Sequence, residues 1–236
     1  MDAAEGPRRL YLFRALEASP PGGVEMVAGS YLVTMAGGRQ VLVDTGPPRE
    51  LPGLDAPVTS VLDQLSALGL GPDDIGIVVS THLDFDHAGW HDAFPNAEHV
   101  IQREHLEVAR GGHQRFAGGR EHWGAPGLHF RAVEGDTDLL PGFRLIATPG
   151  HVQGHQSVLL RLPNTGPVLL TVDAVSMQRD FSAERVASPM DENEEQLRES
   201  TRKLLEIVDR EGVTMTIHHH DAAQWRSLKV APEFYD

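Results

Sequence analysis

The chain has 236 residues, of which 40% are hydrophobic and 23% charged, a composition that excludes a disordered or fibrous protein. Its formal net charge of −14 argues against nucleic acid or an anionic membrane as a partner, because phosphate groups are bound by clustered lysine and arginine. The length predicts a single domain that spans residues 1–236.

The chain contains no cysteine, which excludes disulfides, thiol nucleophiles and cysteine-ligated metal sites. Residues 1–9 do not form the basic and then apolar pattern of a signal peptide. No apolar run approaches the roughly 18 residues that a membrane helix needs. We therefore expect a cytoplasmic protein without a membrane partner.

The first predicted elements in chain order are a β-hairpin, a helix and a strand. Residues 30–35 and 40–44 are strand-like runs on either side of a Gly37-Gly38 turn. Residues 58–68 place apolar side chains at helical spacing and are followed by a glycine. The β-branched run 75–80 is typical of a buried strand.

Residues 103–128 are predicted to be a mobile loop or a loosely helical lid, because glycines interleave there with aromatic side chains. Strands are predicted at 129–133, 143–148, 157–162, 168–172 and 213–217, and the longest helix precedes the last strand and ends at Gly212. Strand groups separated by helices, with both hairpins and crossovers, predict an α/β protein with mixed sheets.

The motif with the clearest chemistry comes directly after the run 75–80 and contains His82, Asp84, Asp86 and His87. Imidazole and carboxylate groups together are the ligand set of zinc and related divalent ions. For any one of these side chains, a solvated polar loop with capping aspartates is the alternative.

Three further predicted strand ends each carry a histidine or an aspartate, namely His151, Asp173 and His220. Chance placement of such residues at four strand ends is improbable, so the sequence predicts a dinuclear metal site. The segments 41–44 and 170–173 are both apolar strands that end in aspartate. This echo indicates either ordinary turn-forming aspartates or a duplicated sheet with functional groups at the same strand end.

The chain resembles the metallo-β-lactamase superfamily, whose signature is His-x-His-x-Asp-His. Its other blocks occur here in the family's order, at 43–46, 148–157, 171–174 and 220–221. Within the superfamily the chain is most similar to the N-acyl homoserine lactone lactonases, through Gly135-Asp136, the segment 154–157, and the block 220–221 that runs into 232–235. The resemblance covers roughly residues 28–236 and implies an αββα sandwich of two mixed β-sheets covered by helices.

The resemblance also implies a role for each motif residue. The first metal ion is expected at His82, Asp84 and His151, the second at Asp86, His87 and His220, and Asp173 is expected to bridge the two. Asp44 and His155 are expected to orient ligands from behind, with a purely structural role as the alternative for His155. His218 and His219 are expected to be structural, with His219 pointing away from His220 because side chains alternate along a strand.

Two positions depart from the family pattern. Asp84 stands where the family has a histidine, and Ser176 stands where the lactonases carry a tyrosine that helps to hold the carbonyl oxygen. A carboxylate still binds metal, so two divalent ions remain the expectation, with zinc first and iron or manganese as alternatives. Ser176, Phe116 and Trp123 are expected to shape the substrate pocket.

The implied activity is the opening of lactone rings, above all those of N-acyl homoserine lactones in quorum quenching. The expected nucleophile is a hydroxide that bridges both ions, with Asp86 as the proton shuttle. The charges of two divalent ions, three carboxylates and one hydroxide cancel, which favours a neutral ester. The alternatives are a phosphodiesterase or phosphotriesterase, and a catalytically decayed metal-binding protein. We expect a small lactone or ester as the partner, and a monomer or homodimer.

Overall fold

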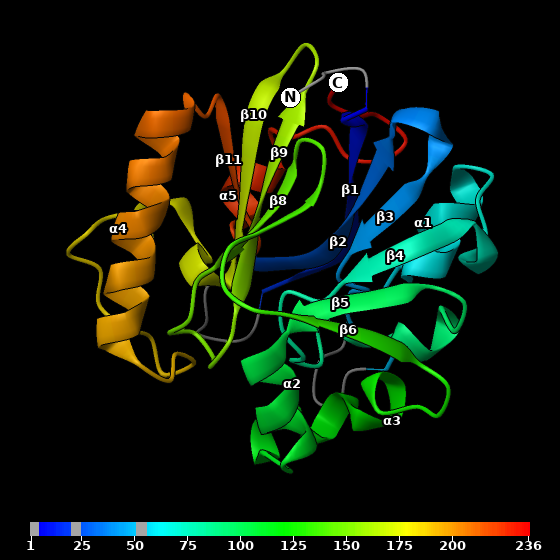
Figure 1. Cartoon of the computed structure of the whole chain (residues 1–236), viewed down its shortest axis with the longest axis horizontal. Coiled ribbons are helices and arrows are strands. Elements are labelled where there is room, and N and C mark those ends of the chain that lie inside the picture. Colours follow the sequence, from blue (N-terminus) through cyan, green and yellow to red (C-terminus); the bar gives the residue numbers. More distant parts are fainter. Residues whose placement is uncertain (1–4, 20–24, 51–55) are drawn as a thin grey trace.

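Two mixed β-sheets pack face to face and carry helices on their outer faces (Figure 1). The computed structural model describes residues 5–19, 25–50 and 56–236. The first sheet has the strand order β1-β2-β3-β4-β5-β6, and the second has the order β11-β10-β9-β8-β7. The predicted αββα arrangement is therefore confirmed.

The first sheet begins with antiparallel strands and continues with parallel ones. Its strands are β1 (Pro7–Ala18), β2 (Met26–Met35), β3 (Gln40–Val43), β4 (Ile75–Val79), β5 (Glu98–Gln102) and β6 (His129–Val133). The pairs from β1 to β3 are antiparallel, and those from β3 to β6 are parallel. The predicted hairpin joins β2 to β3, and Gly37 and Gly38 in its turn have φ of 77° and 84°, which favours glycine.

The second sheet is mostly antiparallel. Its strands are β7 (Thr137–Leu140), β8 (Phe143–Ala147), β9 (Gln156–Leu162), β10 (Gly166–Val172) and β11 (Met215–His218). Only the pair of β10 with β11 is parallel among these strands. Both β10 and β11 therefore end at the same edge of the sheet.

Five α-helices accompany the sheets in the described ranges. They are α1 (Val61–Ala67), α2 (Arg103–Arg110), α3 (Arg120–Trp123), α4 (Glu194–Glu211) and α5 (Ala222–Trp225). Val61 and Leu65 of α1 pack on the first sheet, and Leu204 and Ile207 of α4 pack on the second. Within the described ranges, no helix has the length and apolar character needed to cross a membrane.

The sequence signals at the helix ends match the structure. Ser60 and Asp63 form a capping box at the start of α1, which satisfies backbone N–H groups that have no helical partner. The Asn193 side chain caps α4 by accepting from Gln196 N, and Gly212 ends the helix in the left-handed conformation with φ of 62°, as predicted.

The sequence patterns did not predict three of the described strands, namely β1, β5 and β7. In β1 the consecutive residues 10–13 are all buried, because Leu10 and Leu12 face the other sheet while Tyr11 and Phe13 face the helix layer. A strand covered on both faces shows no alternation of apolar and polar residues. β5 and β7 span five and four residues, too short for a clear periodic pattern.

The glycine-rich segment 103–128 contains α2, a short 3-10 helix (Gln114–Gly119) and α3. Phe116 and Trp123 are buried there in one cluster with Leu83 and Leu106. Because a lid is defined by its motion, that function of the segment stays a prediction, as does the single-domain boundary.

The backbone directs two aspartates from strand ends toward one point. Among the described residues, Asp44 with φ of 57° and Val172 with φ of 50° are the non-glycine residues that have positive φ. Asp44 follows β3, and Val172 precedes Asp173 at the end of β10. This conformation is costly for a residue with a β-carbon, above all for valine, so it marks positions where function overrides local preference.

We expect Trp225→Ala to lower the free energy of unfolding by about 3–5 kcal/mol, the range for removing a large aromatic side chain from a core. Trp225 is 1% exposed between the sheets, and its indole N–H donates to the carbonyl of His218 at 2.9 Å. Urea unfolding measures the change. The control Val186→Ala, at a side chain 71% exposed, should stay within about 0.5 kcal/mol. A loss below about 1 kcal/mol for Trp225→Ala would contradict this account of the core.

Candidate metal centre

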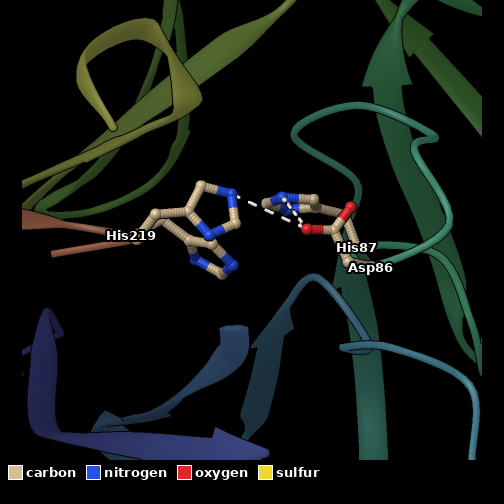
Figure 2. Close-up of side chains that lie close together, drawn as sticks. Asp86, His87 and His219 are labelled. Carbon is tan, nitrogen blue, oxygen red and sulfur yellow. Dashed lines mark ion pairs between the residues drawn. The ribbon is translucent and has the colours of Figure 1, made fainter. Parts of the chain in front are cut away.

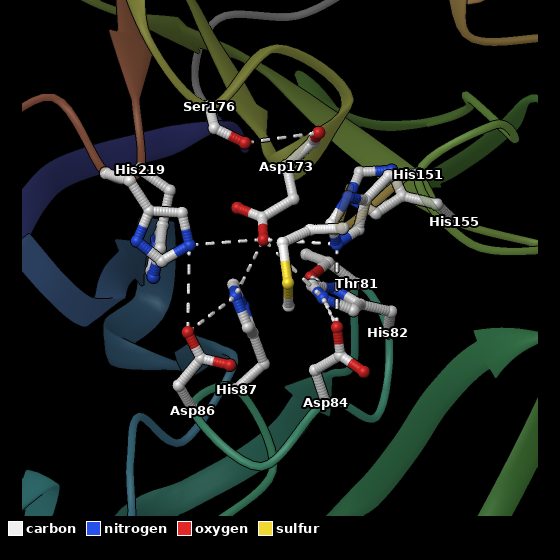
Figure 3. A network of polar contacts seen from close by, with 12 residues as sticks. Thr81, His82, Asp84, Asp86, His87, His151, His155, Asp173, Ser176 and His219 are labelled. Carbon is white, nitrogen blue, oxygen red and sulfur yellow. Dashed lines mark hydrogen bonds and ion pairs between the residues drawn. The ribbon is translucent and has the colours of Figure 1, made fainter. Parts of the chain in front are cut away.

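The predicted ligand residues meet at the edge where the strands of both sheets end, around the carboxylate of Asp173 (Figure 3). Asp173 Oδ2 lies 3.4 Å from His87 Nε2, 3.4 Å from His151 Nε2 and 3.2 Å from His220 Nε2. His82 Nε2 is 3.8 Å from the same oxygen. One buried carboxylate oxygen therefore faces the ring nitrogens of four histidines.

The remaining carboxylates complete two groups of ligand atoms that share Asp173. In the first group, Asp84 Oδ2 lies 3.3 Å from His82 Nε2 and 3.5 Å from His151 Nε2. In the second group, Asp86 Oδ2 lies 3.8 Å from His87 Nε2 and 3.6 Å from His220 Nε2.

These separations fit divalent metal ions. Ligands of a tetrahedral ion with bonds of about 2.0–2.2 Å lie about 3.3–3.6 Å from one another. The ligand atoms of His82, Asp84 and His151 lie within 4.8 Å of one another, as do those of the second group. Each group can therefore hold one ion, and Asp173 Oδ2 is placed to serve both.

Hydrogen bonds behind three of the histidines set which ring nitrogen carries the proton. The Nδ1 atom of His87 donates to Asp44 Oδ2 at 2.9 Å, that of His151 to Asp191 Oδ1 at 2.8 Å, and that of His220 to the Val27 carbonyl at 2.7 Å. Carboxylate and carbonyl oxygens only accept, so each neutral ring has its proton on Nδ1. The Nε2 lone pairs then point toward Asp173.

In this arrangement the Asp173 carboxylate and the neutral histidine Nε2 atoms that face it are all hydrogen-bond acceptors. His82 Nε2, His87 Nε2 and Asp173 Oδ1 are buried and have no hydrogen-bond partner in the part of the chain that the structure describes. Buried polar atoms without partners are costly, and lone pairs that face a carboxylate repel it. Cations between them remove both costs, which is the chemical reason why the centre suits metal ions.

The pKa values of these groups reflect the same excess of acceptors. Burial lowers the pKa of a histidine, yet the charges of Asp173 and Asp86 raise the pKa of His87 well above its ordinary value. They also raise the pKa of His220. Burial raises the pKa of Asp173, but His220 and His87 hold it well below its ordinary value. Burial and the neighbouring His87 lower the pKa of His82 to about 3.

Asp44 has the geometry of an orienting residue, whereas His155 has a different environment. Asp44 accepts hydrogen bonds from Thr81 N at 2.7 Å, Thr81 Oγ1 at 2.7 Å and His87 Nδ1. It thus joins the end of β3 to the loop that begins the motif. His155 instead pairs its Nδ1 with Thr148 Oγ1 at 2.9 Å, and its ring packs 5.1 Å from that of His82.

The expectation that His219 points away from the centre is wrong. Its ring lies 4.3 Å from that of His87 (Figure 2) and 4.7 Å from that of His220. β11 ends at His218, so the alternation of a strand does not extend to His219. Both ring nitrogens are nonetheless engaged, Nδ1 by the Tyr31 hydroxyl at 3.2 Å and Nε2 by the Gly29 N–H at 3.4 Å. This engagement agrees with the structural role that we expected.

A pocket of about 450 Å³ opens onto the centre. Its wall contains Ser176 and the apolar side chains of Met26, Phe85, Met177, Pro189 and Met190. Phe85 is 46% exposed and stands between two acidic residues of the motif.

The prediction that Phe116 and Trp123 line this pocket is wrong. They are 1% and 3% exposed, because the short helices of residues 114–123 turn both rings inward against α2. Phe85 lies on the pocket instead. The available signal was the position of Phe85 between the expected ligands Asp84 and Asp86.

Arg115 and Asp191 are charged residues at the site that the sequence did not predict. Arg115 Nε donates to Asp84 Oδ1 at 2.7 Å and its Nη2 to Asp84 Oδ2 at 2.5 Å. Burial raises the pKa of Asp84, but the neighbouring His151 and His82 and the Arg115 guanidinium hold it well below its usual range. A carboxylate in place of an imidazole was a signal to search for a cation, although nothing local pointed to position 115.

The sequence matches the family model described as the metallo-beta-lactamase superfamily over residues 26–228. An N-acyl homoserine lactonase from Bacillus sp. is 35% identical over 174 residues, which cover 74% of this chain and 67% of that protein. N-acyl homoserine lactonase AttM from Rhizobium radiobacter is 37% identical over 183 residues, covering 74% and 68%. A solved N-acyl homoserine lactone hydrolase, with the product N-hexanoyl-L-homoserine bound at its catalytic metal center, matches with TM-score 0.86 and 29% identity over 98% of this chain and 100% of that chain.

We expect Asp44→Asn to weaken metal binding about 10- to 100-fold, because the amide no longer fixes the proton on His87 Nδ1. Competition with a chelator measures the zinc affinity. The control Asp63→Asn changes a carboxylate that caps α1 and bonds to Ser60 and Arg49, neither of which belongs to the centre, so it should leave zinc affinity unchanged. Equal zinc affinities for Asp44→Asn and the parent protein would rule out the orienting role.

Proposed function

This chain belongs to the metallo-beta-lactamase superfamily, and we propose that it is a metal-dependent hydrolase that opens the lactone ring of N-acyl homoserine lactones, the reaction of quorum quenching. The observation that carries the proposal is Asp173 Oδ2, which four histidine Nε2 atoms surround beside an apolar pocket. Two relatives named N-acyl homoserine lactonase support the choice of substrate, as does the similar hydrolase with N-hexanoyl-L-homoserine bound.

The proposed cofactor is a pair of zinc ions, one in each group of ligand atoms. When bound, two such ions lower the pKa of a shared water toward about 7 and polarise a carbonyl oxygen. His82, Asp84 and His151 would hold one ion, and Asp86, His87 and His220 the other. Asp173 would contact both. Elemental analysis of the purified protein distinguishes zinc from iron or manganese.

Asp86 is the proposed proton carrier. It lines the pocket, and its side chain is 16% exposed, whereas that of Asp173 is 5% exposed. A carboxylate on the open side of the centre can accept a proton from the attacking water and return it to the alkoxide that leaves when the ester bond breaks.

The apolar side chains of the pocket wall can bind an acyl chain. Phe85 and Met190 are 46% and 61% exposed, and they stand with Met26 and Met177 on the wall of the pocket. Burial of an acyl chain against them gains about 0.8 kcal/mol per methylene group. Ser176 lies on the same wall, and its hydroxyl is 3.4 Å from the Asp173 carbonyl, to which it donates.

The predicted neutral charge of the loaded centre needs a correction. Arg115 adds one positive charge in direct contact with Asp84, so the charges no longer cancel. Charge alone therefore does not favour a neutral ester over a phosphate anion. The apolar pocket and the relatives support a lactone instead.

The test of the proposed function is a panel of N-hexanoyl homoserine lactone, an aryl ester and a phosphodiester with zinc-loaded protein. We expect kcat/KM for the lactone to exceed that for the phosphodiester by at least about tenfold. Asp173→Ala should lose both ions and activity, because it removes the shared oxygen. A preference for the phosphodiester would replace the proposal by a phosphodiesterase. Metal binding without turnover of any of the three substrates would indicate a decayed enzyme.

We expect Ser176→Tyr to raise kcat on the lactone, because a phenol hydroxyl reaches farther into the pocket and can donate to the developing oxyanion. A well-placed donor of this kind is worth about 2.7–4 kcal/mol, which sets the upper limit of the gain. Steady-state kinetics with Ser176→Phe as the matched control separates the hydroxyl from the bulk of the ring. Equal kcat values for the two variants would exclude an oxyanion role for the hydroxyl.

A further inference from the structure

The guanidinium group of Arg115 contacts two of the atoms that would hold the first metal ion. Its Nη2 atom lies 2.5 Å from Asp84 Oδ2 and 2.8 Å from His151 Nε2. Its Nε atom donates to both oxygens of Asp84, at 2.7 and 2.9 Å, and its Nη1 atom donates to the Met190 carbonyl at 2.5 Å. The side chain is 17% exposed at the pocket wall.

The contact with His151 excludes a metal ion on the same nitrogen. Because Nδ1 of His151 donates to Asp191, its Nε2 atom has a single lone pair in the neutral ring. A guanidinium has no acceptor, so Arg115 Nη2 must donate to that lone pair. The lone pair can bind either Arg115 or a metal ion, but not both.

The distances lead to the same conclusion. Asp84 Oδ2 and His151 Nε2 are 3.5 Å apart, and Arg115 Nη2 lies beside both. An ion bound about 2.2 Å from both atoms would lie at most about 3.3 Å from Nη2. This limit holds even when the ion is on the side of the two atoms that faces away from Nη2. Two cations at that separation repel each other. The first ion can therefore bind only if Nη2 withdraws.

The second group has no such competitor. Within the described residues, no lysine or arginine nitrogen has a hydrogen bond or ion pair with Asp86, His87 or His220. If Nη2 moved away from the first group, Arg115 would still be held in place. Its Nε atom can keep the hydrogen bond to Asp84 Oδ1, and its Nη1 atom can keep the hydrogen bond to the Met190 carbonyl. A local movement of Nη2 would then leave the first group free to bind an ion.

We propose that Arg115 is a built-in competitor of the first metal ion, so that the two groups bind metal with unequal affinity. The second group retains its ion, whereas the ion of the first group exchanges readily and is expelled when Arg115 returns. The inference rests on the two metal groups of the proposed function, but not on the identity of the substrate. It makes Arg115 a positioning residue that controls the metal content of the centre.

The wild-type protein provides the first test. The zinc-loaded protein is dialysed against graded concentrations of a chelator, and zinc per chain is measured by elemental analysis. We expect two steps of release, in which the first ion leaves at a chelator concentration at least about tenfold lower than the second. Release of both ions in one step would overturn the proposal.

The second test removes the competitor. In Arg115→Met, which keeps an unbranched side chain but has no donor, we expect the weaker ion to bind about 10- to 100-fold more tightly, the effect of freeing two charge-assisted contacts. Arg103→Met is the matched control, because Arg103 pairs with Glu134 on the surface and should leave both steps unchanged. Weaker binding or no change in Arg115→Met would show that Arg115 only supports Asp84.

Arg115→Lys covers the case in which the methionine variant does not fold. A lysine keeps the charge but cannot present the planar fork that reaches Asp84 and His151 together, so we expect tighter binding of the weaker ion than in the wild type. Wild-type protein that holds no zinc at all would contradict the proposed function itself. Two ions of equal affinity would contradict only the role of Arg115.

Discussion

The centre depends on the repulsion between the Asp173 carboxylate and the lone pairs of the histidines around it. Asp44, Asp191 and the Val27 carbonyl hold the protons of three rings on the far nitrogen, so each ring presents an acceptor to an acceptor. While the rings are neutral, no donor within the cluster satisfies the Nε2 atoms of His87 and His220, although the raised pKa values of both residues mean that a bound proton can. Metal cations can do so too, which makes the affinity for metal a property of the outer hydrogen bonds as much as of the ligands.

The fold brings these groups together at a cost in backbone conformation. The parallel pairs of β3 with β4 and of β10 with β11 end at the same edge of their sheets, which places the ligand loops side by side. Asp44 and Val172 adopt positive φ where the chain leaves β3 and β10. The buried cluster between the sheets offsets this strain, since it contains large side chains such as Tyr31, Phe143 and Trp225. The echo of the two strand ends in the sequence corresponds to this shared geometry.

The roles of Asp84 and Arg115 depend on each other because their charges are opposite. A carboxylate in place of a neutral imidazole adds a negative charge to a buried site, and the arginine offsets that charge through two short hydrogen bonds. The same arginine takes the lone pair of His151. The pair therefore restores the charge of the site but places a cation where the first metal ion would bind.

Local patterns in the sequence predicted the mixed sheets and the candidate ligand residues. The hairpin at Gly37-Gly38, the long helix that ends at Gly212 and the motif after β4 depend on residues close in the chain, whose period and turn chemistry can be read directly. Contacts between distant segments were decided by the tertiary structure alone. Arg115 reaches Asp84 from 31 positions away, and Asp191 reaches His151 from 40 positions away. The burial of Phe116 and Trp123 and the inward position of His219 have the same origin, because a side chain's surroundings depend on the packing of other elements, which no local period encodes.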